Sequence, residues 1–201
     1  MKKGRLIINA SNCHSGGGKT LINAFMNGVS DKIETLIYVD ERLEIKFPIS
    51  SSIKIIRISK YRRYLIDFII KKIINKNDKI FYFGNLPPFL KFNSDNVLLM
   101  LSSRFYVDSI NMNGFKIIDR IKIYFEKIYY KVFIKNISQI IVQTSTMRKK
   151  LILSGFKKKI SVWAFDDFDN FSKKITKKLK KKKILLYMSL LFCHIKIIKD
   201  Y

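Results

Sequence analysis

The sequence contains few cysteines and no long hydrophobic run, and each shortage excludes a class of protein. Its 201 residues include two cysteines, Cys13 and Cys193, far apart in the chain. No Cys/His cluster has the spacing of a zinc site, so we expect no metal site and a reducing compartment. The longest apolar stretch, residues 184–193, is too short for a bilayer-spanning helix, which needs about 20 residues. The apolar run at residues 6–8 is likewise too short for the core of a signal peptide.

The overall composition is that of a folded globular protein. Apolar residues make up 48% of the chain and charged residues 27%, and both values are near globular averages. They exclude wholesale disorder, collagen-like repeats and small disulfide scaffolds. The length fits one ordinary domain, or one domain with a tail.

Acidic residues are scarce, and the resulting charge is the unusual property of the chain. Its 40 Lys and Arg stand against 15 Asp and Glu, a formal net charge of +25. Only 8 of the basic residues are Arg, and the 34 Ile are comparable in number to the 32 Lys. Because A/T-rich codons encode Lys and Ile, part of the basicity reflects genome composition. Whatever its origin, the charge favours nucleic acid, phosphorylated substrates or an anionic membrane surface as partners.

Short apolar runs alternate with helix-like segments along the first 165 residues. Strands that are apolar on both faces and alternate with helices indicate a parallel sheet covered on both sides. The predicted fold class is therefore α/β, a Rossmann-like doubly wound parallel sheet. We expect strands at residues 5–10, 33–39, 53–58, 79–83, 97–101, 139–143 and 160–163, and helices at residues 19–27, 61–74, 115–134 and 146–153.

The segment 11–18, after the first predicted strand, is a polar and glycine-rich loop. It leads into Gly18-Lys19-Thr20, which resembles the end of a Walker A motif, but Cys13 stands where that motif needs its first glycine. A P-loop-like nucleotide-binding protein is therefore an alternative. Glycines let a ligand approach the backbone N–H groups at a helix N-terminus, which favour anions. The predicted substrate-binding residues here are Gly16, Gly17, Gly18 and Lys19, and a plain tight turn is the simpler alternative.

Three other sets of polar side chains are candidates for a site. Arg104, after the fifth predicted strand, is placed to pair with a substrate phosphate, with a surface salt bridge as the alternative. His14, in the glycine-rich loop, is a candidate hydrogen-bond donor or acid/base. Carboxylates at Asp166, Asp167 and Asp169 resemble cation ligands, but no His lies nearby. We predict no metal site from them.

Two predicted helices combine apolar and basic residues. The segment 61–76 has basic residues beside a broad apolar face, which is typical both of a membrane-surface helix and of core packing. The aromatic residues of 115–133 recur at helical spacing, so we expect them in the core rather than as a stacking platform for bases. No nucleic-acid recognition module has a signature in the chain, and nucleic acid is not an expected partner. A basic membrane- or nucleic-acid-binding module remains an alternative function.

The segment order resembles the N-terminal half of a family 4 glycosyltransferase of the two-Rossmann-domain, GT-B type. The resemblance covers residues 5–170 and is most specific at residues 120–133, which include Glu126, and at residues 140–151 (IIVQTSTMRKKL). Ala164 stands where the family usually has Pro. The other stretches that carry the resemblance are 6–19 (LIINASNCHSGGGK), 38–43 (YVDERL), 84–90 (GNLPPFL) and 97–108 (VLLMLSSRFYVD).

The resemblance implies a transferase that moves a sugar from a nucleotide-sugar to a lipid-linked saccharide acceptor in cell-surface polysaccharide or O-antigen assembly. In that family the N-terminal domain mainly holds the acceptor, and its first glycine loop, here Gly16, Gly17 and Gly18, faces the donor phosphates. The donor is a substrate, so no cofactor is implied, and no catalytic residue is assigned. The resemblance also implies a cytoplasmic protein, peripheral on the inner face of the membrane, where its basic surface docks on the anionic leaflet.

The chain departs from the family after residue 170. We expect a Rossmann-like domain at residues 1–170, a Lys-rich linker at 171–183 and a short apolar and basic tail at 184–201. The family's second domain, with its paired glutamates, is expected to be missing, and the chain to be truncated and inactive alone. One back-translation of residues 193–201, read one base out of phase, resembles the opening of that second domain. We therefore expect a frameshift near the lysine tract, with a genuine short protein as the alternative.

Overall fold

Seven strands form one parallel sheet in the computed structural model, which describes residues 4–29, 31–92, 96–107, 112 and 114–163. The predicted α/β doubly wound sheet is confirmed. Its strand order is β3-β2-β1-β4-β5-β6-β7, and every neighbouring pair is parallel. The strands are β1 (Leu6–Ala10), β2 (Thr35–Asp40), β3 (Ile53–Ile58), β4 (Lys79–Phe83), β5 (Val97–Leu101), β6 (Gln139–Val142) and β7 (Lys159–Val162).

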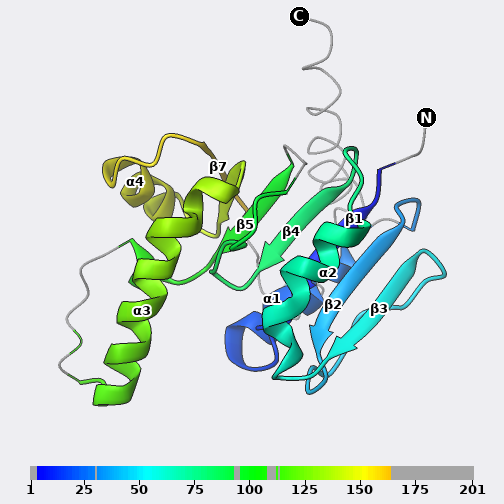
Figure 1. Ribbon diagram of the computed structural model, residues 1–201, viewed down its shortest axis with the longest axis horizontal. Coiled ribbons are helices and arrows are strands. Elements are labelled where there is room, and N and C mark those ends of the chain that lie inside the picture. The colour runs from blue at the N-terminus through cyan, green and yellow to red at the C-terminus, as the bar shows by residue number, and fades with distance from the viewer. Residues whose placement is uncertain (1–3, 30, 93–95, 108–111, 113, 164–201) are drawn as a thin grey trace, which may run out of the picture.

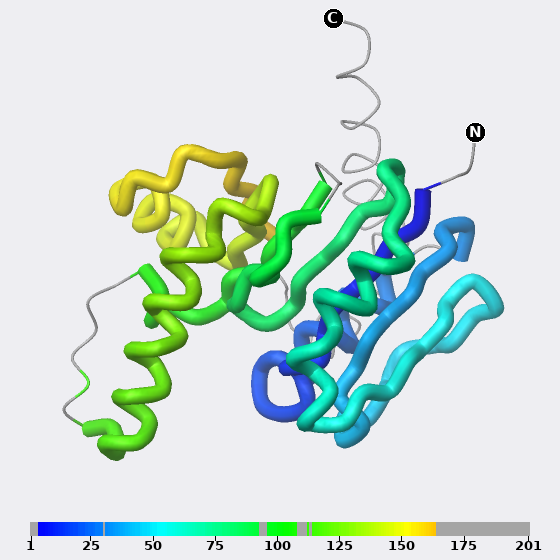
Figure 2. Tube along the Cα trace, viewed as in Figure 1, coloured from blue at the N-terminus to red at the C-terminus, as the bar shows by residue number. Residues whose placement is uncertain are grey.

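The chain winds outward from the middle of the sheet in both directions (Figure 2). It starts at β1, builds β2 and β3 on one side, and then crosses to β4 on the other side of β1. The connections that leave β1 and β4 therefore diverge at the carboxyl edge of the sheet. In open α/β sheets this divergence creates the crevice in which ligands bind.

Helices cover both faces of the sheet (Figure 1). The helix α1 packs on one face through Ile22, Phe25 and Met26, which are buried against β1 and β4 residues such as Phe81. The other helices pack on the opposite face, which α2 and α3 cover on the viewer's side of Figure 1. They are α2 (Ile66–Ile73), α3 (Ile117–Phe133) and α4 (Ser145–Leu153), and three short 3₁₀ turns accompany them: η1 (Arg62–Leu65), η2 (Arg104–Tyr106) and η3 (Ile134–Asn136).

The helix α1 (Gly16–Asn27) begins earlier than the sequence predicts. Gly16, Gly17 and Gly18 belong to its first turn, so the prediction that they are loop is wrong. Glycine is a poor helix former in helix interiors, but the first N–H groups of a helix need no intrahelical partner. Gly16 has φ 57°, a left-handed conformation that glycine adopts without steric cost.

The helix α4 begins and ends as its sequence predicts. The Thr144 hydroxyl oxygen accepts a hydrogen bond from the Met147 N–H at 3.2 Å, which caps the first turn. At the other end Gly155 has φ 82° and lies just beyond the helix. These two signals fix a helix whose own amphipathic pattern is weak.

The helix α3 (Ile117–Phe133) differs from its prediction in burial. Tyr130 is the one buried side chain on this helix, all of whose residues are described. The expectation that the aromatics of 115–133 form core is therefore wrong for most of them. Apolar residues occur all round the helix, and only one of its sides meets the sheet. Tyr124 and Phe125 consequently lie on the solvent side and are exposed.

Several predictions concern residues beyond the described ranges. The Lys-rich linker 171–183 and the tail 184–201 lie outside them, as does the end of the predicted domain after residue 163. Cys193 and the Asp166, Asp167 and Asp169 carboxylates are in the same position.

Candidate functional site

A cleft lies at the carboxyl edge of the sheet, where the chain turns away from β1 and β4. It has a volume of about 210 Å³, and the loop after β1, the first turns of α1 and the ends of β4 and β5 form its walls. This is the divergence point of the strand order, the position at which α/β sheets bind ligands. Its lining residues are Asn12, Cys13, Ser15, Gly18, Leu21, Phe83, Gly84, Asn85, Met100 and Ser102.

A second hollow of about 520 Å³ adjoins the first. Gly18, Leu21 and Ser102 line both hollows. The second hollow extends along the carboxyl edge toward the end of β6, and its remaining lining residues are Gly17, Thr20, Ser103 and Gln143. The two hollows together give a ligand a continuous path from β1 to β6.

The first turn of α1 presents backbone to the cleft. An added Cβ at Gly17 would have no atom within 4 Å, so that position faces open space. Ser15 precedes the helix in an extended conformation, and its side chain makes no capping hydrogen bond within the described part of the chain. The first N–H groups therefore point out of the helix without a side-chain cap, and such groups favour an anion.

The floor of the cleft is held by close contacts between the β1 loop and the end of β4. The Cys13 thiol donates a hydrogen bond to the Phe83 carbonyl oxygen at 3.1 Å. Burial raises the pKa of Cys13 to about 12, so the thiol stays neutral and is not a nucleophile at ordinary pH. At Gly84, which has φ 135°, an added Cβ would lie 3.3 Å from the Asn12 Cβ. Glycine is needed there both for its conformation and for the space.

Asn85 forms the wall between β4 and β5. It has φ 72°, a left-handed conformation that Asn tolerates better than most residues. Its side-chain oxygen accepts hydrogen bonds from the N–H groups of Ser102 at 2.7 Å and Ser103 at 2.9 Å, and from the Ser102 hydroxyl at 3.0 Å. One side chain thus fixes the backbone of the loop that lines both hollows.

A buried carboxyl group supports the segment behind Asn85. Asp67, on α2, accepts hydrogen bonds from the Tyr82 hydroxyl at 2.5 Å and from the Phe89 N–H at 2.8 Å. Burial raises the pKa of Asp67, and these hydrogen bonds oppose the rise. These hydrogen bonds connect α2 to β4 and to the segment 84–90. Asp67 therefore helps to fix the segment that includes the lining residue Asn85.

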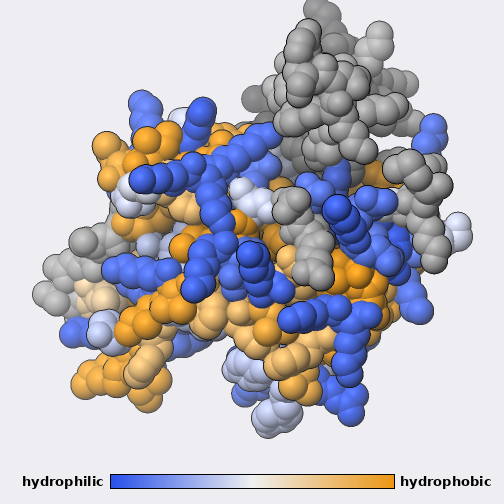
Figure 3. All heavy atoms as spheres, turned by 45° about the horizontal axis from the view of Figure 1, so that its top comes forward, coloured by the Kyte–Doolittle hydropathy of each residue, from blue (hydrophilic) through white to orange (hydrophobic). Residues whose placement is uncertain are grey.

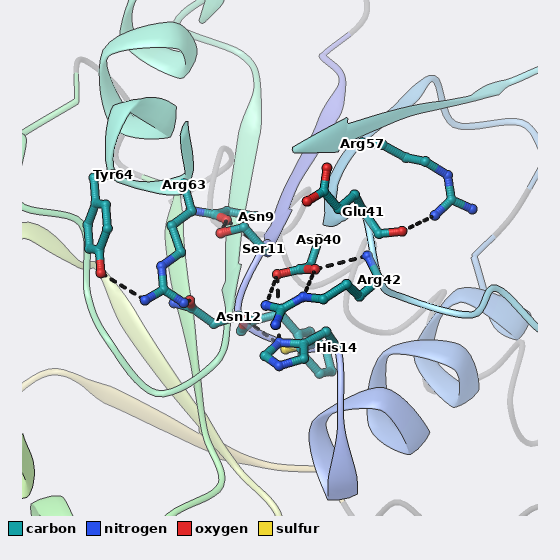
Figure 4. Close-up of polar contacts among 12 residues, drawn as sticks. Asn9, Ser11, Asn12, His14, Asp40, Glu41, Arg42, Arg57, Arg63 and Tyr64 are labelled. Atoms are coloured by element: carbon teal, nitrogen blue, oxygen red, sulfur yellow. Dashed lines mark hydrogen bonds and ion pairs between the residues drawn. The ribbon is translucent and has the colours of Figure 1, made fainter. Parts of the chain in front are cut away.

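Charged groups flank the β1 loop on two sides (Figure 4). On one side the Asp40 carboxylate, at the end of β2, accepts two hydrogen bonds of 2.7 Å from the Arg42 guanidinium. Arg42 therefore holds the pKa of Asp40 at about 2, against the effect of burial. The His14 Nδ1 atom lies 3.7 Å from the nearer Asp40 oxygen. His14 is thus beside this ion pair and is not among the residues that line the hollows.

On the other side, η1 brings Arg63 to the β1 loop. The Arg63 guanidinium donates hydrogen bonds to the Asn12 side-chain oxygen at 3.4 Å and to the Tyr64 hydroxyl at 2.8 Å. Its Nε atom is buried without a hydrogen-bond partner among the described residues. Arg63 therefore places a positive charge beside Asn12, which lines the first hollow.

The predicted site residues fall in three different environments. Gly17 and Gly18 line the hollows, and Gly16 forms the turn into α1. The Lys19 ammonium group instead lies 2.5 Å from the Glu44 carboxylate and is not in the lining of either hollow. Arg104 is an exposed residue of η2, next to Ser103 of the second hollow, and is likewise not a lining residue.

Three residues of the site were not singled out from the sequence. The segments 84–88 and 102–108 follow predicted strands, at the carboxyl ends where α/β sheets bind ligands, but no motif distinguishes Asn85 or Ser102 within them. Asn after Gly is also typical of a left-handed turn position. Arg63 belongs to a predicted helix, and no local signal distinguishes it from the adjacent Arg62. Contacts between distant parts of the sequence bring Asn85 to Ser102 and Arg63 to Asn12.

The lining offers binding groups rather than acid–base groups. Backbone N–H groups, amides and hydroxyls line the two hollows beside apolar side chains. Among the described residues, neither lining includes a carboxylate, an imidazole or a cationic side chain. Within the described ranges, no group of three or more His, Cys, Asp or Glu could hold a metal ion. Such neutral donors suit a phosphate or a sugar hydroxyl.

Fold and cleft together define a class, a Rossmann-like α/β domain with a cleft at the divergence point of its sheet. No family model, curated protein or solved structure matches the chain. No helix in the described part of the chain is long and apolar enough to cross a membrane.

Proposed function

We propose that this chain is the acceptor-side domain of a GT-B glycosyltransferase. In this proposal the carboxyl-edge cleft binds the diphosphate of a nucleotide-sugar at the point where the donor meets a saccharide acceptor. The observation that carries the proposal is the position of the cleft. It lies at the divergence of β1 and β4, against the glycine-rich first turn of α1.

The chemistry of the lining supports this choice of ligand. Glycosyl transfer from a nucleotide-sugar releases a nucleoside diphosphate, whose negative charge must be stabilised as it develops. Backbone N–H groups at the start of α1 provide this stabilisation without a bound metal. The hydroxyls and amides of Ser102, Ser103 and Gln143 offer hydrogen bonds to sugar hydroxyls. Arg63, beside Asn12, adds a positive charge at the rim.

The family resemblance agrees with the same assignment. The stretches 6–19 and 84–90, which carry the resemblance, are the two that meet at Gly84 and Asn12 in the structure. The resemblance implies that the first glycine loop faces the donor phosphates, that a second domain binds the rest of the donor, and that the acceptor is lipid-linked. It also implies that the protein works at the cytoplasmic face of an anionic membrane.

The P-loop alternative receives less support from the geometry. A P-loop wraps its glycines around the phosphates and directs its lysine to them. Here Cys13 stands in place of the first glycine of the motif, and Lys19 is paired with Glu44. We therefore retain the transferase as the proposed function.

The proposal can be tested by two-dimensional NMR of the whole chain during a titration with UDP-glucose, GDP-mannose and inorganic pyrophosphate. The expected result is that the amide signals of Gly17, Gly18 and Ser102 shift with at least one probe, with a Kd below about 1 mM. The amide of Gly114, which is not a lining residue, is the internal reference. Unchanged Gly17 and Gly18 signals with all three probes would contradict the proposal.

A matched pair of arginine variants sharpens the test. Arg63→Ala should weaken pyrophosphate binding by about tenfold, because a charged hydrogen-bond donor beside the cleft is lost. Arg62→Ala removes the same charge from the neighbouring exposed position and should leave the affinity nearly unchanged. Equal losses in the two variants would indicate a general effect of net charge rather than a site.

A further inference from the structure

The helix α3 turns large apolar side chains toward solvent. Ile117 is 72% exposed and Phe125 is 64% exposed, and others on the same helix are similarly open to solvent. We call the following set the α3 stripe: Ile117, Ile121, Tyr124, Phe125, Ile128 and Val132. Exposed apolar surface of this extent marks an interaction site more often than a chance feature of a monomer.

The stripe is one continuous face of the helix. Ile117, Ile121, Tyr124, Ile128 and Val132 follow one another at steps of three or four residues, which places them on one side of an α-helix. In Figure 1 the helix runs along the left of the view, and its first turn projects beyond the sheet. Hydrophobic side chains gather at the lower left of Figure 3, where this end of α3 lies.

The opposite side of α3 attaches the helix to the domain. Tyr130 is buried and its ring lies 5.5 Å from the ring of Tyr106. The Glu126 carboxylate accepts a hydrogen bond from the Tyr106 hydroxyl at 2.9 Å. At 3.6 residues per turn, Glu126 and Tyr130 lie about half a turn away from the stripe. The stripe therefore faces away from the body of the protein.

Basic residues border the stripe and acidic residues do not. Arg120, Lys127 and Lys131 lie along one edge of the stripe, and Lys122 lies along the other. The two carboxylates of α3, Asp119 and Glu126, are on the opposite side of the helix. This arrangement combines an apolar face, aromatic side chains and flanking cations, the pattern of a helix that lies in the plane of an anionic bilayer surface.

The segment 61–76, which the sequence offers as a membrane-surface helix, is less suitable than α3. Ile66 and Ile70 of α2 are fully buried against the sheet, whereas Tyr61, Tyr64, Leu65 and Phe68 of the same segment are exposed. The apolar residues of this segment are therefore divided between the core and solvent. On α3, whose residues are all described, only Tyr130 is buried, and the apolar face as a whole lies on the solvent side.

We propose that the α3 stripe docks the protein on an anionic lipid bilayer. Charge selects this partner over a second copy of the chain, because two copies that each carry a net charge of +25 repel one another. Phosphatidylglycerol and related lipids provide the opposite charge. The inference deepens the proposed function, since it assigns the surface that would bring the domain to a lipid-linked acceptor.

The test is binding of the full chain to vesicles of phosphatidylcholine with about a quarter phosphatidylglycerol, measured by sedimentation. The stripe variant is Ile117→Ser with Ile121→Ser. The matched control is Ile152→Ser with Leu153→Ser on α4, where the two side chains are 54% and 85% exposed, against 51% for Ile121. All four side chains lie at the surface, so both variants should fold. The stripe variant should bind at least about tenfold more weakly, and the control should bind as the wild type does.

A second measurement reads the position of the stripe directly. Phe125→Trp adds a second tryptophan to Trp163. Relative to the wild-type protein under the same conditions, the emission of this variant should shift to the blue with anionic vesicles and remain unchanged with pure phosphatidylcholine. An unshifted emission with anionic vesicles would overturn the proposal, as would equal vesicle binding by the stripe and control variants. Pyrophosphate binding by the stripe variant should equal that of the wild type. That comparison separates a failure of membrane docking from a failure of the proposed function.

Discussion

The side-chain oxygen of Asn85 accepts a hydrogen bond of 2.7 Å from the backbone N–H of Ser102, across the ends of β4 and β5. The same oxygen accepts from the Ser102 hydroxyl at 3.0 Å and from the N–H of Ser103 at 2.9 Å. The loop after β5 lines both hollows of the carboxyl-edge cleft. The shape of the cleft therefore depends on one amide side chain held in a left-handed backbone conformation.

Substitutions at Asn85 should separate its two roles. Asn85→Gly keeps the left-handed conformation accessible and removes the accepted hydrogen bonds, so we expect a loss of about 1–2 kcal/mol in the free energy of unfolding. Asn85→Ala adds backbone strain and should cost about 1 kcal/mol more. Urea denaturation measures both values. If alanine proved no worse than glycine, backbone strain at φ 72° would have no part in the stability of this loop.

Gly84→Ala should destabilise the floor of the cleft. The added Cβ would lie 3.3 Å from the Asn12 Cβ, at a φ of 135° that L residues rarely adopt. We expect a loss of about 1–3 kcal/mol in the free energy of unfolding. Gly114→Ala is the control, because an added Cβ there meets no atom within 4 Å. Similar stability of the two variants would show that the Asn12 contact does not constrain Gly84.

The Asp40–Arg42 pair predicts a specific pH dependence. The pKa of Asp40 is lowered from its ordinary value of 3.8 to about 2 in the folded protein. Its contribution to stability is therefore complete above about pH 4 and is lost as the pH falls through about 2. Arg42→Ala raises the pKa of Asp40 and should move the midpoint of acid unfolding, followed by circular dichroism, to higher pH.

Arg57→Ala is the matched control for that titration. The Arg57 guanidinium donates to the backbone carbonyl oxygens of Glu41 and Leu43, not to the Asp40 carboxylate. Its removal should leave the acid midpoint where it is in the wild type. The assignment to Asp40 fails if both variants shift the midpoint by the same amount.

Lys19 distinguishes the transferase from the P-loop alternative. Its ammonium group is paired with the Glu44 carboxylate at the surface and is not in the lining of either hollow. Lys19→Ala should therefore change the affinity for pyrophosphate less than about tenfold. Lys46→Ala, which removes the other lysine beside Glu44, is the control. Complete loss of ATP binding in Lys19→Ala alone would instead support a P-loop enzyme.

Most of the sheet could be predicted from the sequence because its signals are local. Strands such as β3 (Ile53–Ile58) and β4 (Lys79–Phe83) are short apolar runs between turn residues, and their bounds match the prediction. The start of α1 differs because three glycines disfavour a helix by propensity alone. The burial of α3 differs from the prediction because helical spacing of apolar residues does not reveal which side of the helix packs on the sheet. Tyr130 is buried against the domain, whereas Tyr124 is exposed to solvent.

The candidate site could be predicted only in part. The glycine-rich first turn follows from a motif within one segment, and Gly17 and Gly18 do line the hollows. The contact from Asn85 to Ser102 and the approach of Arg63 to Asn12 join residues far apart in the sequence. Such contacts depend on how the strands and helices pack, and no local pattern encodes them.

The most direct test of the central claim is the affinity of Gly17→Ala for inorganic pyrophosphate, measured by isothermal titration calorimetry beside wild type and Gly114→Ala. The added methyl group meets no protein atom and suits a helix, so the thermal midpoint should be unchanged or raised. If the diphosphate binds against the first turn of α1, the methyl group occupies its place, and the affinity should fall at least about tenfold. Gly114→Ala should bind as wild type does. Wild-type affinity in Gly17→Ala would contradict the claim that this turn of α1 holds the ligand.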